Sequence, residues 1–235
     1  MRLRAVFVLL FAIAFAASPF FVPGFGGYDP TQFPVPLENP PVQPAGYAFS
    51  IWGLIYLWLI ASAAQGLWRR AQVPAWDATR LPLILSLAVG AIWLAVAVAS
   101  PILATVLIWV MLGGALVALS RTPTTDRLIL RGPLGLYAGW LTAASAVSLG
   151  LLAAGWGIPP FGPDGWAIAA LSLGLVIAIA TLIRTPSPAY GAAVIWALIG
   201  VLVQNGPSLV GFFALAAALG IAAVAIIAER RTRTR

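Results

Sequence analysis

The chain has 235 residues, of which 62% are hydrophobic and only 8% are charged, and it contains no cysteine and no histidine. Soluble domains carry roughly 25% charged residues, so this composition argues against a soluble fold and indicates an integral membrane protein. The missing thiols and imidazoles exclude disulfides, thiolate metal sites, the usual haem and zinc ligands and the commonest general base.

A helix needs about 20 apolar residues to cross a bilayer, and the apolar segments predict an all-α protein with eight transmembrane helices. In chain order we expect spans at 5–22, 47–68, 81–98, 102–120, 133–155, 167–184, 188–204 and 208–228. Only Ser100-Pro101 divides the third span from the fourth, because proline cannot continue a helical hydrogen-bond ladder.

The first span has two interpretations. Arg2 and Arg4, an apolar run and Ala16-Ala17-Ser18 also resemble a cleavable signal peptide. We favour a retained helix, because eight spans return the arginine-rich tail to the side on which the chain starts.

The segment 23–46 is the longest loop. Its seven prolines make it extended and stiff; they are Pro23, Pro30, Pro34, Pro36, Pro40, Pro41 and Pro44. A plain connector and a lid over an outward-facing pocket both fit this composition.

The charges alternate between the junctions of the spans. All thirteen basic residues are arginines at alternate junctions, and Asp29, Glu38 and Asp164 occupy junctions that lack arginine. The positive-inside rule then predicts an N-in/C-in protein of a bacterial inner membrane, with both termini cytoplasmic. The same scatter over short loops argues against a nucleic-acid partner and makes the lipid bilayer the expected partner.

Polar chemistry inside the spans is sparse. Intramembrane acids normally mark ion or proton pathways, but Asp77, Asp126 and Glu229 all lie beside arginines at the expected cytoplasmic rim. No nucleophile–base pair or metal cluster is evident, so we expect no enzyme activity, no catalytic residues and no metal site.

Ten tryptophans are the specialised side chains of this sequence. We assign Trp68, Trp76, Trp156 and Trp166 to the interfacial belts of a membrane protein. Five others fall within the spans: Trp58, Trp93, Trp109, Trp140 and Trp196. An indole offers one N–H donor and a flat face, so helix packing and a pocket for a flat hydrophobic ligand both remain open for this set.

Small residues recur every four positions on the fifth span, at Gly135, Gly139 and Ala143. Such spacing lets helix backbones approach closely. The partner helix belongs either to this chain or to another copy.

Two stretches carry a resemblance. Pro44-Ala45-Gly46-Tyr47-Ala48-Phe49-Ser50-Ile51-Trp52-Gly53-Leu54-Ile55-Tyr56 resembles the entry to the second helix of the tryptophan-rich sensory protein (translocator protein, TspO/MBR) family. Pro133, Tyr137, Trp140 and Ala144 resemble its fifth-helix signature, and Trp93 matches a third-helix tryptophan. The resemblance covers residues 1–155, so we expect a five-helix membrane domain there and a three-helix extension with a basic cytoplasmic tail at 156–235.

The resemblance implies a five-helix bundle, often dimeric, that binds porphyrins and other flat hydrophobic molecules such as sterols. Family members are linked to tetrapyrrole transport, sensing and light-dependent porphyrin breakdown. Gly90 and Ser148 stand where the family has asparagines, which removes polar anchors from the pocket. Carried over by position, the ligand-binding candidates are Pro44, Gly46, Phe49, Trp52, Tyr56, Trp93, Tyr137 and Trp140.

We therefore expect a non-enzymatic membrane protein that binds a flat hydrophobic ligand of the porphyrin or tetrapyrrole type in sensing, regulation or transfer, with no required cofactor. One alternative is a small-molecule transporter that uses all eight spans. Another is a structural or assembly subunit of a larger, pigment-containing membrane complex.

Overall fold

The computed structural model describes residues 1–22 and 26–233, and this part of the chain is helical without strands. Eight helices in it are long and apolar enough to cross a membrane, which confirms the expected fold class. They are α1 (Arg2–Phe21), α2 (Ile51–Trp68), α3 (Pro74–Ala99), α4 (Pro101–Ser120), α5 (Gly132–Gly155), α6 (Pro163–Arg184), α7 (Pro188–Asn205) and α8 (Leu209–Arg233).

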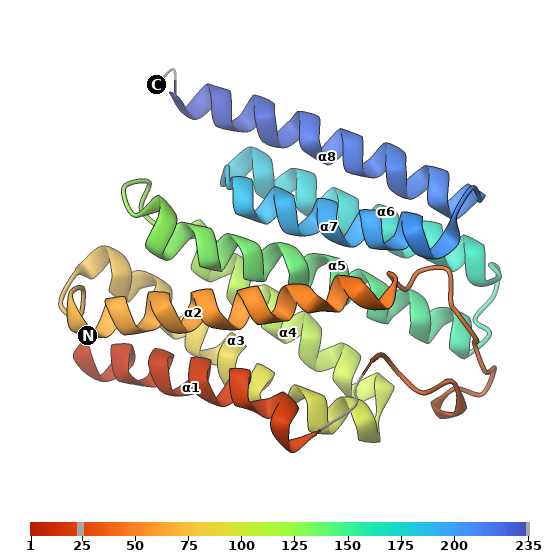
Figure 1. The fold of residues 1–235 in the computed structure, drawn as a ribbon, viewed down its shortest axis with the longest axis horizontal. Helices are drawn as coiled ribbons and strands as arrows, with labels where there is room; N and C mark the ends of the chain where they lie inside the picture. Colours follow the sequence, from red (N-terminus) through yellow and green to blue (C-terminus); the bar gives the residue numbers. More distant parts are fainter. Residues whose placement is uncertain (23–25, 234–235) are drawn as a thin grey trace.

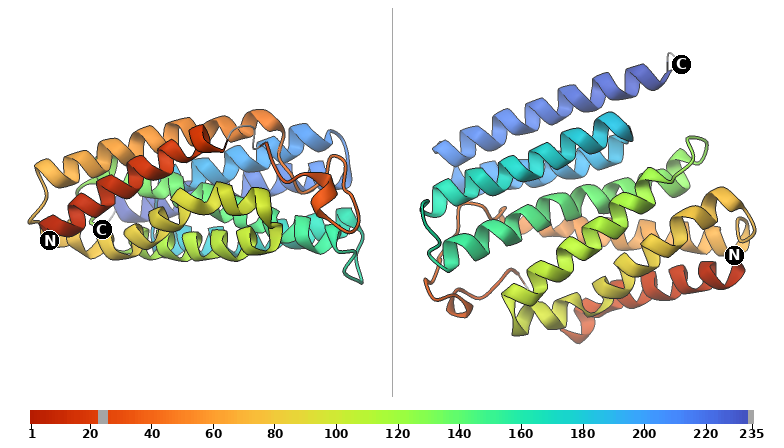
Figure 2. Two further views of the ribbon diagram at one scale, coloured as in Figure 1. Left: turned by 90° about the horizontal axis from the view of Figure 1, so that it is seen from below. Right: turned by 180° about the vertical axis from the view of Figure 1, so that it is seen from behind.

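The helices lie side by side with their axes roughly aligned (Figures 1 and 2), and their contacts define two rings that share α5. In the first ring α1 packs against α2 and α3, α4 packs against α3 and α5, and α2 closes the ring on α5. In the second ring α5 packs against α6 and α7, and α8 packs against both of these. The division into two domains at residue 155 stays a prediction, and α5 belongs to both rings.

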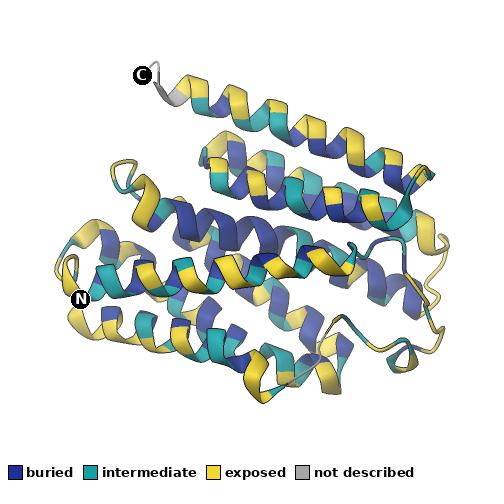
Figure 3. Cartoon of the chain, viewed as in Figure 1, coloured by how far each residue is buried: buried dark blue, intermediate teal, exposed yellow. Residues whose placement is uncertain are grey.

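The shared helix is the most buried one (Figure 3), with 19 of its 24 residues buried. Its small residues explain how α7 can lie so close. A side chain at Gly135 would meet the Ser187 hydroxyl, and one at Gly139 would meet the Tyr190 carbonyl oxygen. The small-residue pattern of α5 therefore serves packing within this chain.

Several helix boundaries differ from the expected ones, among them the starts of α2, α3 and α5. α3 begins at Pro74 instead of residue 81, because a proline suits the first turn of a helix and Asp77 in that turn is neutralised by arginines. A short 3₁₀ helix, Gly46–Ser50 (η2), precedes α2, and a π-helical turn, Arg127–Arg131 (η3), leads into α5. The break at Ser100-Pro101 is confirmed.

Ion pairs gather at the end of the bundle where the described chain starts and finishes (Figure 1). The pairs, with N–O distances, are Arg4–Asp77 (2.7 Å), Arg80–Asp77 (3.1 Å), Arg70–Asp126 (3.8 Å) and Arg127–Glu229 (2.7 Å). We call this the arginine end. Its cytoplasmic orientation stays a prediction.

Trp76 corrects one expectation at the arginine end. It is not an interfacial anchor, because its ring is buried against Gly66 and its Nε1 donates to Asp126 Oδ2 at 2.7 Å. Trp68, in contrast, is 78% exposed.

The loop before α2 is tied down at the opposite end. Gln32 Nε2 donates to the Val98 carbonyl of α3 at 2.8 Å, and Val35 N donates to the Gly155 carbonyl of α5 at 2.9 Å. Asn205 Nδ2 of α7 donates to the Pro41 carbonyl at 2.8 Å. The loop therefore covers this end of the bundle, while Pro23 lies outside the described residues.

Candidate functional site

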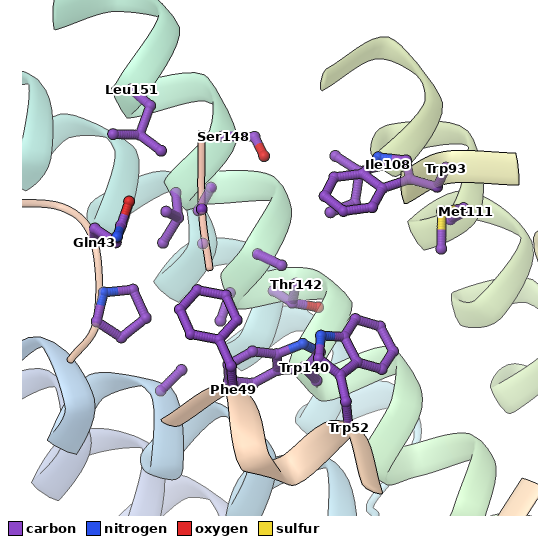
Figure 4. A pocket seen from close by; sticks show the side chains of 18 of the residues that line it. Gln43, Phe49, Trp52, Trp93, Ile108, Met111, Trp140, Thr142, Ser148 and Leu151 are labelled. Carbon is purple, nitrogen blue, oxygen red and sulfur yellow. The ribbon is translucent and has the colours of Figure 1, made fainter. Parts of the chain in front are cut away.

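A cavity of about 540 Å³ lies beside α5, beneath the loop (Figure 4). Both rings contribute to its wall. One side comes from α1 to α4, and the other from α6 and α7, while the loop adds Tyr28, Gln43 and Pro44. This volume is in the range of pockets for drug-sized ligands.

Aromatic side chains form one wall of the cavity. Trp52 and Tyr56, one turn apart on α2, stack with their ring centroids 5.3 Å apart and an interplanar angle of 18°. Trp140 of α5 meets Trp52 edge to face at 6.1 Å and Phe49 at 5.9 Å. Phe15 of α1 braces the Trp52 ring from a third helix at 5.4 Å.

Trp93 and Trp140, both in the wall, differ in the hydrogen bonding of their indole N–H groups. Trp93 Nε1 donates to the Ala104 carbonyl at 2.8 Å, so this residue offers the cavity only its ring. Trp140 is 2% exposed, and its Nε1 has no hydrogen-bond partner among the described residues. A buried N–H without a partner is costly, and this distinguishes Trp140 from Trp93.

Six of the eight sequence-predicted ligand residues line the cavity: Pro44, Phe49, Trp52, Tyr56, Trp93 and Trp140. Gly46 instead starts η2 and is exposed.

Tyr137 lies behind the aromatic wall and is fully buried. Ser86 Oγ donates to the Met111 carbonyl at 2.7 Å, and it lies 2.8 Å from the Tyr137 hydroxyl. A serine hydroxyl has one proton, so Tyr137 is the donor to Ser86. This chain of bonds joins α5, α3 and α4, and its role is to hold the wall in place.

Gly90 and Ser148, which stand where the family that the sequence resembles has asparagines, both have structural roles. Gly90 leaves room for the Phe15 ring, which would lie 3.0 Å from a Cβ at this position. Ser148 lines the cavity, with its Oγ 3.5 Å from the Tyr28 hydroxyl of the loop. Burial raises the pKa of Tyr28, so this hydroxyl remains neutral and serves as a polar, uncharged group.

Sequence reasoning missed the contribution of α6 and α7. Their lining residues are Leu171, Gly174, Leu175, Val194, Ala197, Leu198 and Val201. All are small or aliphatic, and nothing in a single sequence separates them from residues that face lipid.

α7 also positions the η2 segment that leads into α2. Trp196 Nε1 donates to the Ala48 carbonyl at 2.9 Å, and Ala45 N donates to the Gly200 carbonyl at 3.0 Å. A Cβ at Gly200 would meet Pro44 and Ala48 at 2.8 and 2.9 Å, so a glycine is needed for this approach. The second ring thus places Pro44 and Phe49 in the cavity.

The lining of the cavity is uncharged and mainly apolar. No carboxylate or guanidinium is among its lining residues, and the described part of the chain holds no group of three or more His, Cys, Asp or Glu side chains. The groups that line the cavity are aromatic ring faces, aliphatic side chains and a few neutral polar groups, and these suit an apolar, aromatic ligand.

One of three comparisons with known proteins gives a match. No curated protein and no solved structure matches the sequence. A family model described as TSPO-like protein matches residues 6–227, which includes α6, α7 and most of α8 as well as the first five helices. The chain therefore belongs to the TSPO-like protein family.

Proposed function

We propose that this membrane protein is a non-enzymatic binding protein for a flat, hydrophobic ligand of the tetrapyrrole type, acting in sensing, regulation or transfer. The ligand occupies the cavity beside α5, with a ring face against the Trp52–Tyr56 stack. The observation that carries the proposal is the mainly aromatic and aliphatic, uncharged wall of this cavity, in which the Trp140 N–H has no partner among the described residues.

The energetics favour a ligand with both a flat surface and a hydrogen-bond acceptor. Each 100 Å² of apolar ligand surface taken from water contributes about 2.5 kcal/mol. A ligand arriving from the bilayer gains much less, because lipid tails are as apolar as the cavity wall. Selectivity then depends on ring stacking and on an acceptor that reaches Trp140 Nε1. A porphyrin with carboxylate or carbonyl substituents supplies both.

A binding titration tests this proposal. A metal-free, carboxylate-bearing porphyrin is added to purified protein in a non-ionic detergent, and its absorption shift is followed. The double variant Trp52→Ala/Trp140→Ala removes the stacking face and the donor, so we expect its affinity to fall by about tenfold or more. The matched control is Trp68→Ala, because Trp68 is exposed at the arginine end and outside the cavity.

Unchanged affinity in the double variant, measured with folded protein, would contradict this binding site. Equal losses in the double variant and in Trp68→Ala would indicate porphyrin adsorption to the detergent-covered surface. Porphyrin flux into liposomes that depends on an imposed gradient would favour transport over binding alone.

A further inference from the structure

A second cavity, of about 250 Å³, lies at the arginine end, away from the aromatic wall. Its walls are the η3 turn, the first residues of α5 and α7, Trp58 of α2 and Glu229 of α8. It shares none of its lining residues with the first cavity.

The charges of this cavity do not balance. Arg127, Arg131 and Glu229 line it, and Arg127 Nη1 is paired with Glu229 Oε1 at 2.7 Å. Arg131 takes part in none of the ion pairs of the described chain, and its buried Nε has no hydrogen-bond partner there. Glu229 is the one carboxylate among the lining residues and acts on both Arg127 and Arg131, so the lining keeps a net positive charge, which favours an anion from outside the protein.

The surroundings of Arg131 fit a phosphate group. A guanidinium binds phosphate through a planar fork of N–H donors. The N-terminal end of α7 and the η3 turn that continues into α5 also contribute residues to the cavity, and the helix dipole places partial positive charge at the start of a helix.

The outer side of the cavity is apolar. Leu128 on the η3 turn is 69% exposed, and Trp58 supplies an indole to the wall. Aromatic and aliphatic side chains beside a cationic group are typical of the membrane interface, where headgroup phosphates lie.

From the charge, the cavity and these neighbours, we propose that the pocket formed by Arg131, Arg127 and Trp58 binds the phosphate of an anionic ligand, supplied either by a phospholipid headgroup or by a soluble phosphate. This site is independent of the ligand cavity beside α5. Porphyrin binding therefore serves as a check that each variant below is folded.

The test measures the unfolding temperature of the full chain in non-ionic detergent as short-chain phosphatidylglycerol, short-chain phosphatidylcholine or inorganic phosphate is added. We expect phosphatidylglycerol to raise the unfolding temperature and phosphatidylcholine to have little effect. Arg131→Gln should raise the half-saturating concentration by about tenfold or more. Arg184→Gln is the matched control, because Arg184 is exposed at the same end and outside the cavity.

The three additives distinguish the two sources of phosphate. A shift with phosphatidylglycerol alone identifies a lipid headgroup, and an equal shift with inorganic phosphate identifies a soluble anion. Equal effects of the two lipids, or equal binding by wild type and Arg131→Gln, would overturn the proposal. If the glutamine variant does not fold, Arg131→Lys gives the same comparison: it keeps the charge without the fork, so weaker binding supports the site and unchanged binding overturns it.

Discussion

The indole rings of Trp52 and Trp140 meet edge to face, with centroids 6.1 Å apart and an interplanar angle of 82°. This contact joins α2 to α5 where the two helices bound the cavity. Edge-to-face packing fixes both rings without using the Trp140 N–H, which has no partner among the described residues. The wall thus packs closely between the two indole rings, while one of its hydrogen-bond donors stays unused among the described residues.

Trp140→Phe separates the contribution of the aromatic ring from that of the N–H donor. The substitution keeps an aromatic ring and removes the donor, so we expect weaker binding of a carboxylate-bearing porphyrin, by about 1.5–3 kcal/mol for a bond to a charged acceptor. Protein stability should hold or rise, because a buried unsatisfied donor disappears. Porphyrin titration and thermal unfolding of the same samples measure both effects. Binding equal to wild type would show that the N–H does not contact the ligand.

The eight helices were predictable, because membrane spans are identified by the composition and length of apolar segments, and both can be read from a single sequence. The contacts between the helices were harder to predict. Trp52, Phe49 and Trp140 were found through a resemblance in the sequence, and they do line one cavity. Tyr137, in the same motif, lies behind that wall, because its hydroxyl pairs with Ser86.

The part of the cavity formed by α6 and α7 could not be foreseen. Val194 and Ala197 line the cavity, whereas Ile199 and Val203 of the same helix are exposed, yet all four are apolar residues of similar kind. In a soluble protein the exposed face of a helix is polar, which reveals its orientation. In a membrane helix both faces are apolar, so only packing distinguishes them.

Gly139→Ala tests the close approach of α5 to α7. The added methyl would meet the Tyr190 carbonyl oxygen, which belongs to the backbone and cannot swing aside. We expect a loss of about 1–3 kcal/mol of stability. Gly113→Ala is the matched control, since a Cβ there meets nothing within 4 Å, and its effect should stay below about 1 kcal/mol. Unfolding in a mixed-detergent titration compares the two variants, and equal stabilities would contradict this packing.

Arg80→Gln tests the polar centre of the arginine end. Arg80 is 3% exposed and binds Asp77 together with the carbonyl oxygens of Met1, Gly66, Arg70 and Ala71.

Removing the charge of Arg80 leaves the carbonyl oxygens and the Asp77 carboxylate poorly paired, so we expect the free energy of unfolding to fall by about 3–5 kcal/mol. Arg69→Gln, at an exposed site, should change stability by less than about 0.5 kcal/mol. Both variants are measured by the same thermal unfolding assay in detergent. A similar small effect of both substitutions would mean that Arg80 is dispensable for the fold.

The orientation in the membrane can be measured directly, because the chain has no cysteine and each introduced one is unique. We expect Arg69→Cys and Arg121→Cys to be labelled by a membrane-impermeant maleimide only after the cytoplasmic side is opened. Glu38→Cys and Asp164→Cys should react in intact cells, because Glu38 lies on the loop before α2 and Asp164 in the exposed first turn of α6, both at the opposite end. The guanidinium-rich junctions resist transfer across the bilayer, and this resistance is the physical basis of the predicted orientation. Labelling of positions 69 and 121 from opposite sides would contradict the eight-span arrangement itself, whereas labelling of both from outside would invert it and place the anion pocket on the outer face.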